Sequence, residues 1–161
     1  MEITEQALSK LKEETKEYYN SLKEVYCPYF NASVKFTSGG FQHIFYKNAS
    51  KNKERDKSSQ IIRLKLFKLA QKLLRDSKTV QEYFCNNEFV IIKMNKRKEK
   101  MMKAVYYWGF IGIIDGKKIK VIVRQVGSGD KKFWSIIPNW ITRKSHENNT
   151  IITYRGDLKS D

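Results

Sequence analysis

Helix-like patterns come first along the chain and strand-like patterns follow. Between residues 3 and 25 apolar side chains recur at helical spacing among Glu and Lys, and Pro28 soon follows. A second helical stripe, Ile62, Leu66, Leu69 and Leu73, begins after Ser58 or Ser59, either of which can cap a helix. From residue 88 onward the apolar residues fall into runs typical of strands: EFVIIKMN, AVYYWGFIGII, KIKVIVRQV, KKFWSII and TIITY. We therefore predict an α+β fold, with N-terminal helices packed on a C-terminal antiparallel sheet of four to five strands.

The segment between the two helical stripes has a less regular pattern. Residues 31–37 alternate like a short strand, Ser38-Gly39-Gly40 is a break, and the segment after it is predicted to be a short helix or turn. Residues 48–59 are almost entirely polar and predict a loop. We expect an amphipathic helix over residues 1–28 and a single α+β domain over residues 29–161.

Two turns set the expected register of the late strands. Asp115-Gly116 between apolar runs predicts a type I′ hairpin, which places Tyr107 opposite Arg124. A second turn near Gly127–Asp130 brings Ser135 beside Ile122 on the next strand. The register predicts a core face with Trp108, Phe110, Ile114, Ile119, Val121, Val123, Trp134 and Ile136. The opposite face is predicted to carry Tyr107, Lys118, Lys120, Arg124 and Ser135, with Ile111 and Ile122 among them.

Charge is the property that most narrows the class of partner. The 161 residues include 32 Lys and Arg against 17 Asp and Glu, a formal net charge of +15. Such a charge attracts polyanions, of which nucleic acid is the commonest. A lineage whose genome is biased toward lysine codons would, however, give the same excess of positive charge. The isolated Cys27 and Cys85 are predicted to be small buried residues of a reducing compartment. With no long apolar run and no export signal, we expect a cytoplasmic protein that does not span a membrane.

Several chemistries lack support in the sequence. Zinc, calcium and nucleotide-fold motifs such as HExxH, paired CxxC, an EF-hand loop, GxxxxGK[ST] or GxGxxG after a strand are absent, so we expect no metal and no cofactor. RNA can nonetheless be cut without a metal, because its 2′-hydroxyl is an internal nucleophile. Such an enzyme needs an acid or base and positive charge at the phosphorus.

Two stretches carry a resemblance to a known family. SGGFQHIFYK (residues 38–47) and KKIKVIVRQVGSGDKKFWSIIP (117–138), together with the Arg-, Lys- and Leu-rich helix, resemble the phage- and toxin-associated nucleases of the barnase–EndoU–colicin–RelE superfamily. The resemblance runs from about Tyr29 to Pro138. It implies N-terminal helices before a four- or five-stranded antiparallel sheet, and metal-independent RNase activity of toxin or phage origin.

The resemblance also implies roles for particular residues. The helical His of the family falls on His43, its strand Arg on Arg124, and its small hydroxyl residue on Ser135. In this interpretation His43 is the general acid or base of 2′-hydroxyl attack, which leaves a 2′,3′-cyclic phosphate. Arg124 with Lys131 or Lys132 would stabilise the phosphorane, while Ser135 and Tyr107 would orient phosphate or relay a proton. Lys47, Lys118, Lys120, Lys131 and Lys132 are the candidate contacts to nucleic acid.

Alternatives stay open at this point. The sheet has no second His, so the acid/base partner of His43 is Tyr107 or Lys47, or the enzyme is inactive. His43 can equally be a partly buried polar residue at the start of a helix. The alternative function is a non-catalytic basic module of phage origin that binds nucleic acid or protein. RNA is the expected partner, and a toxin would also have an acidic antitoxin or immunity protein.

Overall fold

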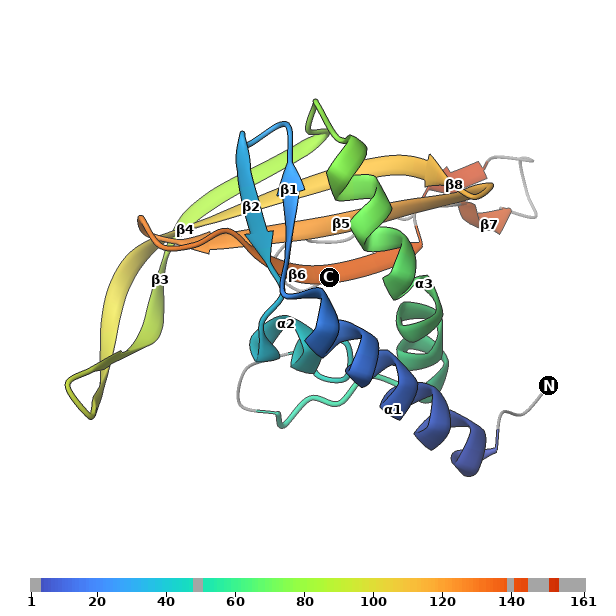
Figure 1. Cartoon of the computed structure of the whole chain (residues 1–161), viewed down its shortest axis with the longest axis horizontal. Coiled ribbons are helices and arrows are strands. Elements are labelled where there is room, and N and C mark those ends of the chain that lie inside the picture. The colour runs from blue at the N-terminus through green and yellow to red at the C-terminus, as the bar shows by residue number, and fades with distance from the viewer. Residues whose placement is uncertain (1–3, 48–50, 139–140, 145–150, 154–161) are drawn as a thin grey trace.

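The fold is known from a computed structural model, which describes all residues except 1–3, 48–50, 139–140, 145–150 and 154–161 (Figure 1). Its helices are α1 (Glu5–Leu22), α2 (Ser38–His43) and α3 (Lys57–Asp76). Its strands are β1 (Glu24–Cys27), β2 (Ala32–Lys35), β3 (Glu82–Met94), β4 (Arg97–Ile114), β5 (Lys117–Val126), β6 (Lys132–Pro138), β7 (Ile141–Lys144) and β8 (Ile151–Thr153).

The predicted α+β class is confirmed, with one strand more than expected in the main sheet. In the described residues six strands form a sheet in the order β1-β2-β6-β5-β4-β3, antiparallel except for β2 with β6, and β7 with β8 forms a separate pair. The missed strand is β1, whose residues continue the helical pattern of α1. Lys23 ends that helix with a positive φ of 53°, and the chain returns as β2 through Asn31, whose φ is 49°.

The orientation of α3 differs from the sequence prediction. Asp56 caps the helix by accepting a hydrogen bond from the Ser59 N–H at 2.7 Å, where Ser58 or Ser59 was expected to be the cap. The expected stripe is also rotated: Ile62 is 37% exposed, while Phe67, Ala70 and Leu74, which lie beside the stripe, are buried. The core face consists of Leu64, Leu66, Phe67, Ala70, Leu73 and Leu74. The opposite side of α3 carries Lys65, Lys68, Lys72 and Arg75, which are all exposed.

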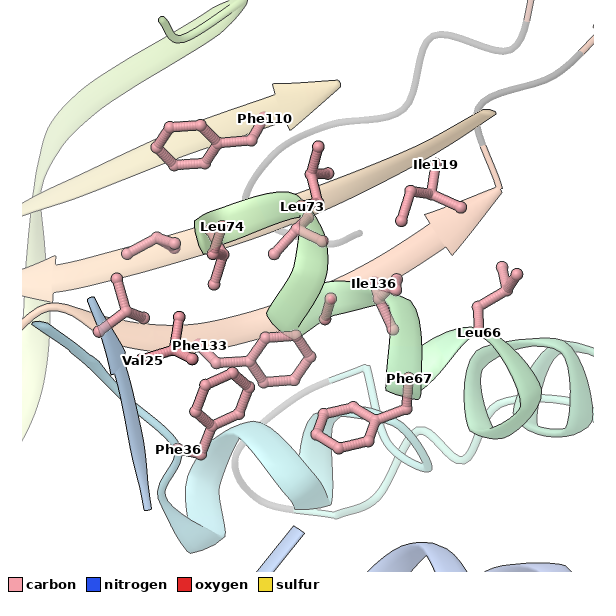
Figure 2. Packing of buried hydrophobic residues seen from close by; sticks show 14 of the residues in the cluster. Val25, Phe36, Leu66, Phe67, Leu73, Leu74, Phe110, Ile119, Phe133 and Ile136 are labelled. Atoms are coloured by element: carbon pink, nitrogen blue, oxygen red, sulfur yellow. The ribbon is translucent and has the colours of Figure 1, made fainter. Parts of the chain in front are cut away.

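The core lies between α3 and one face of the sheet (Figure 2). Phe36 from the segment after β2 stacks on Phe133 of β6 with ring centroids 5.1 Å apart, and both contact Phe67 of α3 edge-on. Tyr19 of α1 joins these rings and donates a hydrogen bond to the Thr37 carbonyl. Each fully buried Phe contributes roughly 1.5–3 kcal/mol, so this cluster joins α1, the segment after β2, and α3 to the sheet.

The first predicted hairpin register is confirmed. Asp115 and Gly116 have the positive φ angles of a type I′ turn, 50° and 77°, and Tyr107 pairs with Arg124 as expected. Trp108 pairs with Val123 and packs at the edge of the core.

The β3–β4 hairpin is longer than the strands predicted from sequence. Pairing of β4 with β5 begins at Val105, so the part of the hairpin from Glu88 to Lys103 extends beyond the third strand. Figure 1 shows this part, here called the hairpin arm, projecting away from the helices. Cys85, expected to be buried, is exposed on β3. In the described part of the chain, no helix is both long and apolar enough to cross a membrane.

Candidate functional site

A β-bulge in β6 sets which side chains face the site. Ser135 pairs with Ile122, as predicted, but Val123 pairs with Phe133 and the register shifts between them. Trp134 is therefore the extra residue. The prediction that Trp134 joins the core is wrong: Phe133 takes the core position, and Trp134 packs against Tyr107 and Ile122 on the opposite face.

The short helix α2 reaches this face at the edge of β6. The described pairing of β2 with β6 is limited to Lys35 and Lys132, so beyond that point α2 and α3 lie against β6. The approach is close at Gly40, where a Cβ atom would lie 2.3 Å from the Phe133 carbonyl oxygen. The second glycine of the Gly-Gly break is thus a requirement of packing, since a larger residue at Gly40 would collide with backbone.

His43 is the last residue of α2 and is 3% exposed. Its ring stacks on Trp134, with centroids 4.3 Å apart and planes 24° apart. Arg55 lies beside it, with its Nε donating to the His43 carbonyl and its NH2 3.0 Å from His43 Nε2. A guanidinium has donors alone, so Nε2 must accept, which requires a neutral imidazole with its proton on Nδ1.

Arg124 contacts the same tryptophan from β5. Its guanidinium carbon lies 4.6 Å from the Trp134 ring centroid, and its Nε donates to the Tyr107 hydroxyl at 3.2 Å. That hydroxyl donates in turn to Glu88 Oε2 at 2.9 Å. Burial raises the pKa of Tyr107 to about 12, partly offset by Arg124 and reinforced by Glu88. Tyr107 is therefore a neutral phenol at physiological pH, and its contact with Arg124 holds the guanidinium in place.

Ser135 is fully buried and belongs to a different set of contacts. Its hydroxyl accepts a hydrogen bond from Arg63 NH1 of α3, and the same nitrogen lies 3.4 Å from the Ile136 carbonyl oxygen. Arg63 is itself 6% exposed. The structure thus brings His43, Arg124 and Tyr107 together around Trp134, while Ser135 lies next to Trp134 in the chain and is held by Arg63.

A pocket of about 300 Å³ opens beside Arg124 and Trp134, and His43, Tyr107 and Ser135 are not among the residues that line it. One wall is the start of α2, and the other is the β5–β6 hairpin with Arg124, Lys132 and Trp134. The other lining residues are Thr37, Ser38, Gly39, Gly40, Val126, Gly129, Asp130 and Phe133. Asp130 forms a salt bridge of 3.0 Å with Lys35, which offsets its charge. The arrangement suits a small anionic group, since a guanidinium and an ammonium meet in one concave site.

The remaining predicted lysines differ in how they relate to this pocket. Lys132 lines it, and Lys131 follows the same turn but lies over Phe30, 5.1 Å from the ring centroid. Lys47 and Lys118 are exposed, and Lys118 is six residues before Arg124 on β5, roughly 20 Å away along the strand. Lys120 was expected on an open polar face but is 1% exposed, with Glu82 Oε2 at 3.4 Å.

Sequence reasoning missed two arginines. Arg55 lies in the stretch interpreted as a polar loop, and Arg63 lies within a helix whose stripe was placed one position away. Both are buried, and each binds a residue that the sequence had singled out, His43 or Ser135. The burial of Arg63 could have been predicted from the helical pattern, since Arg63 is adjacent to Leu64 and lies on the same side of α3 as Phe67 and Ala70.

Side chains that could bind a metal are not gathered near the pocket. Within the described residues, no group of three or more His, Cys, Asp or Glu side chains is close enough to hold an ion. Comparison with protein-family models, curated proteins and solved structures found no match to this chain.

Proposed function

We propose that this protein is an endoribonuclease of toxin or phage origin that cleaves RNA in the cytoplasm without a metal ion. The observation that carries the proposal is the contact of Trp134 with both His43 and Arg124. A candidate base from the helical half and a candidate phosphate ligand from the sheet thereby share one neighbour, although their segments are far apart in sequence.

The phosphate would bind in the pocket beside α2. Arg124 is suited to this because Tyr107 occupies its Nε, which leaves the two terminal nitrogens to form a bidentate contact with phosphate oxygens. Lys132 would add a second positive charge from the same wall. In the phosphorane, where negative charge increases, these two cations would stabilise the transition state more than the ground state.

His43 would take the proton from the 2′-hydroxyl. The contact with Arg55 NH2 keeps the imidazole neutral, which is the state that a general base needs. Because Arg55 occupies Nε2, the 2′-hydroxyl would have to replace it there. Tyr107, with its pKa raised to about 12, donates its hydroxyl hydrogen bond to Glu88 and positions Arg124, and it is unsuited to act as a base near neutral pH.

The direct test is RNA cleavage in excess EDTA. Purified protein is incubated with an end-labelled RNA and with the same RNA carrying 2′-deoxy substitutions, and the ends of the products are identified. We expect 2′,3′-cyclic phosphate ends on the RNA and no cleavage at 2′-deoxy positions. His43→Ala should abolish cleavage, and Lys65→Gln, on the exposed side of α3 and away from the pocket, is the control substitution and should cleave like the wild type. Cleavage that needs Mg²⁺, or that persists in His43→Ala, would disprove this mechanism.

The burial of His43 favours a second candidate, a non-catalytic RNA-binding module. An imidazole that is 3% exposed and held by Arg55 and Trp134 can also be purely structural. In that case EDTA-treated protein binds RNA, with log K falling linearly with log salt, and cleaves none of it. If the protein is a toxin, an acidic antitoxin or immunity protein would be expected to cover Arg124 and Lys132, and its binding should compete with RNA.

A further inference from the structure

The face of the β3–β4 hairpin opposite the pocket carries a row of aromatic side chains. Alternation along paired strands puts odd-numbered residues of β3 and even-numbered residues of β4 on this face. It includes Tyr83, Phe89, Tyr106 and Trp108, together called the aromatic face. Phe89 is 63% and Tyr83 is 57% exposed, an unusual amount for large aromatic side chains on one sheet surface.

Three of the four rings form a continuous series. Tyr106 stacks on Trp108 with centroids 5.8 Å apart and planes 19° apart, and Tyr83 lies 5.9 Å from the same indole. Phe89 lies further along the arm, paired with the exposed Met102. The series therefore lies at the edge of the core, where Trp108 packs. Phe89 is a separate ring on the projecting arm, four residues beyond the Cys85 that pairs with Tyr106, or roughly 13 Å along the strand.

The charges on this face are all positive. Lys93, Lys98 and Lys100 belong to it, and Lys100 Nζ lies 5.3 Å from the Phe89 ring centroid. Over Glu82–Met94 and Arg97–Ile114, the three carboxylates, Glu82, Glu88 and Glu99, all fall on the other face by the same alternation. Lys131 adds a fourth ammonium beside Trp108, 6.0 Å from its ring centroid.

We propose that the aromatic face binds a single-stranded segment of RNA, whose bases stack on Tyr83, Tyr106 and Phe89 while Lys93, Lys98 and Lys100 contact its phosphates. Proteins that bind single strands combine stacking rings with positive charge in this way. A second copy of this chain is a poorer fit, because two such faces would place like charges together. The proposal deepens the proposed function by naming the single-stranded form of the substrate, but it concerns binding alone.

The test uses a probe that cannot be cleaved. A fluorescein-labelled 2′-O-methyl oligouridylate lacks the 2′-hydroxyl nucleophile and does not pair with itself, so fluorescence anisotropy reports single-strand binding. Removing one stacking ring should weaken binding by roughly 5-fold or more, so Tyr83→Ala with Phe89→Ala should have a larger effect than either change alone. Both side chains are exposed, and a circular dichroism melt checks that the fold is kept. Ile113→Ala, at an apolar position on β4 that is 70% exposed, is the matched control and should bind like the wild type.

The lysines provide an independent measurement. Replacing Lys93, Lys98 and Lys100 with Gln should reduce the slope of log K against log salt by about 2, because each phosphate that a lysine neutralises on a single strand adds about 0.7 to that slope. Unchanged affinity in the aromatic variants, or equal affinity for a duplex of the same length, would overturn the proposal. So would light scattering that shows a dimer in the wild type and a monomer in Phe89→Ala. Failure to cleave RNA would affect the proposed function and leave this result standing.

Discussion

Substitution of Gly40 by Ala should destabilise the protein by moving α2 away from β6. The added Cβ would lie 2.3 Å from the Phe133 carbonyl oxygen and 2.8 Å from the Tyr19 hydroxyl, where real Cβ contacts essentially never fall below 3.0 Å. The helix must therefore move by about 0.7 Å against a backbone atom of the sheet. Such overpacking costs about 1–3 kcal/mol or more, against a gain of about 1 kcal/mol in helix propensity.

Gly39→Ala is the matched control, because it makes the same chemical change one residue earlier in α2. There the nearest atom to an added Cβ is Thr37 Oγ1, 3.9 Å away, and neither glycine has a positive φ. We expect Gly39→Ala to be neutral or to stabilise by up to about 1 kcal/mol. Because both changes gain the same helix propensity, the two variants should differ in urea unfolding by the overpacking cost, about 1–3 kcal/mol or more, and in a thermal melt by at least about 2 °C. Equal stability of the two variants would show that α2 does not pack on β6 as described.

Three further outcomes are expected. Since burial raises the pKa of Tyr107 from 10.0 to about 12, its neutral form is favoured in the folded state, so stability should fall as pH rises from 10 to 12. Tyr107→Phe should flatten that fall in urea unfolding measured across this pH range, and an unchanged slope would contradict the assignment. Ser135→Ala removes one acceptor of a buried guanidinium and should cost about 1–3 kcal/mol in urea unfolding. Arg63→Met in the same chain should rescue part of this loss, whereas additive destabilisation would argue against the contact. By the same measurement Phe67→Ala should lower the free energy of unfolding by about 3–5 kcal/mol and Ile62→Ala by under about 1 kcal/mol. The reverse order would mean that α3 buries the stripe expected from sequence, with Ile62 in the core.

The fold could be predicted from sequence wherever the pattern is local. Asp115-Gly116 determines its turn by itself, because few residues tolerate positive φ at both positions, and the β4–β5 register follows from it. The strand β1 could not be predicted, because the apolar positions Leu22 and Val25 fit a continued helix as well as a strand. What separates the two is pairing with β2, which is a contact between segments and leaves no periodic signal.

The candidate site was less accessible to sequence reasoning. His43 and Arg124 could both be selected from sequence as candidates for one site, but Trp134, which contacts both, was expected in the core. The bulge places Trp134 on the same face as Arg124 and shifts the alternation of β6 by one residue. A prediction that assumes strict alternation along a strand cannot anticipate such an extra residue. Arg55 was missed because polar loop composition does not distinguish a solvated guanidinium from one that folds back onto a helix end.

The bulge in β6 also separates the ring that His43 and Arg124 contact from the strand pairing that forms the core. Consecutive residues of a regular strand lie on opposite faces of the sheet. Phe133 and Ser135 lie on opposite faces although Trp134 stands between them in the chain, as they would if they were consecutive. Trp134 can therefore be regarded as a one-residue insertion that leaves the core pairing on both sides intact. Without Trp134 the two flanking residues would keep their faces, so Phe133 would stay buried in the same sheet. The ring that contacts both His43 and Arg124 is therefore added at a position that the core pairing does not use.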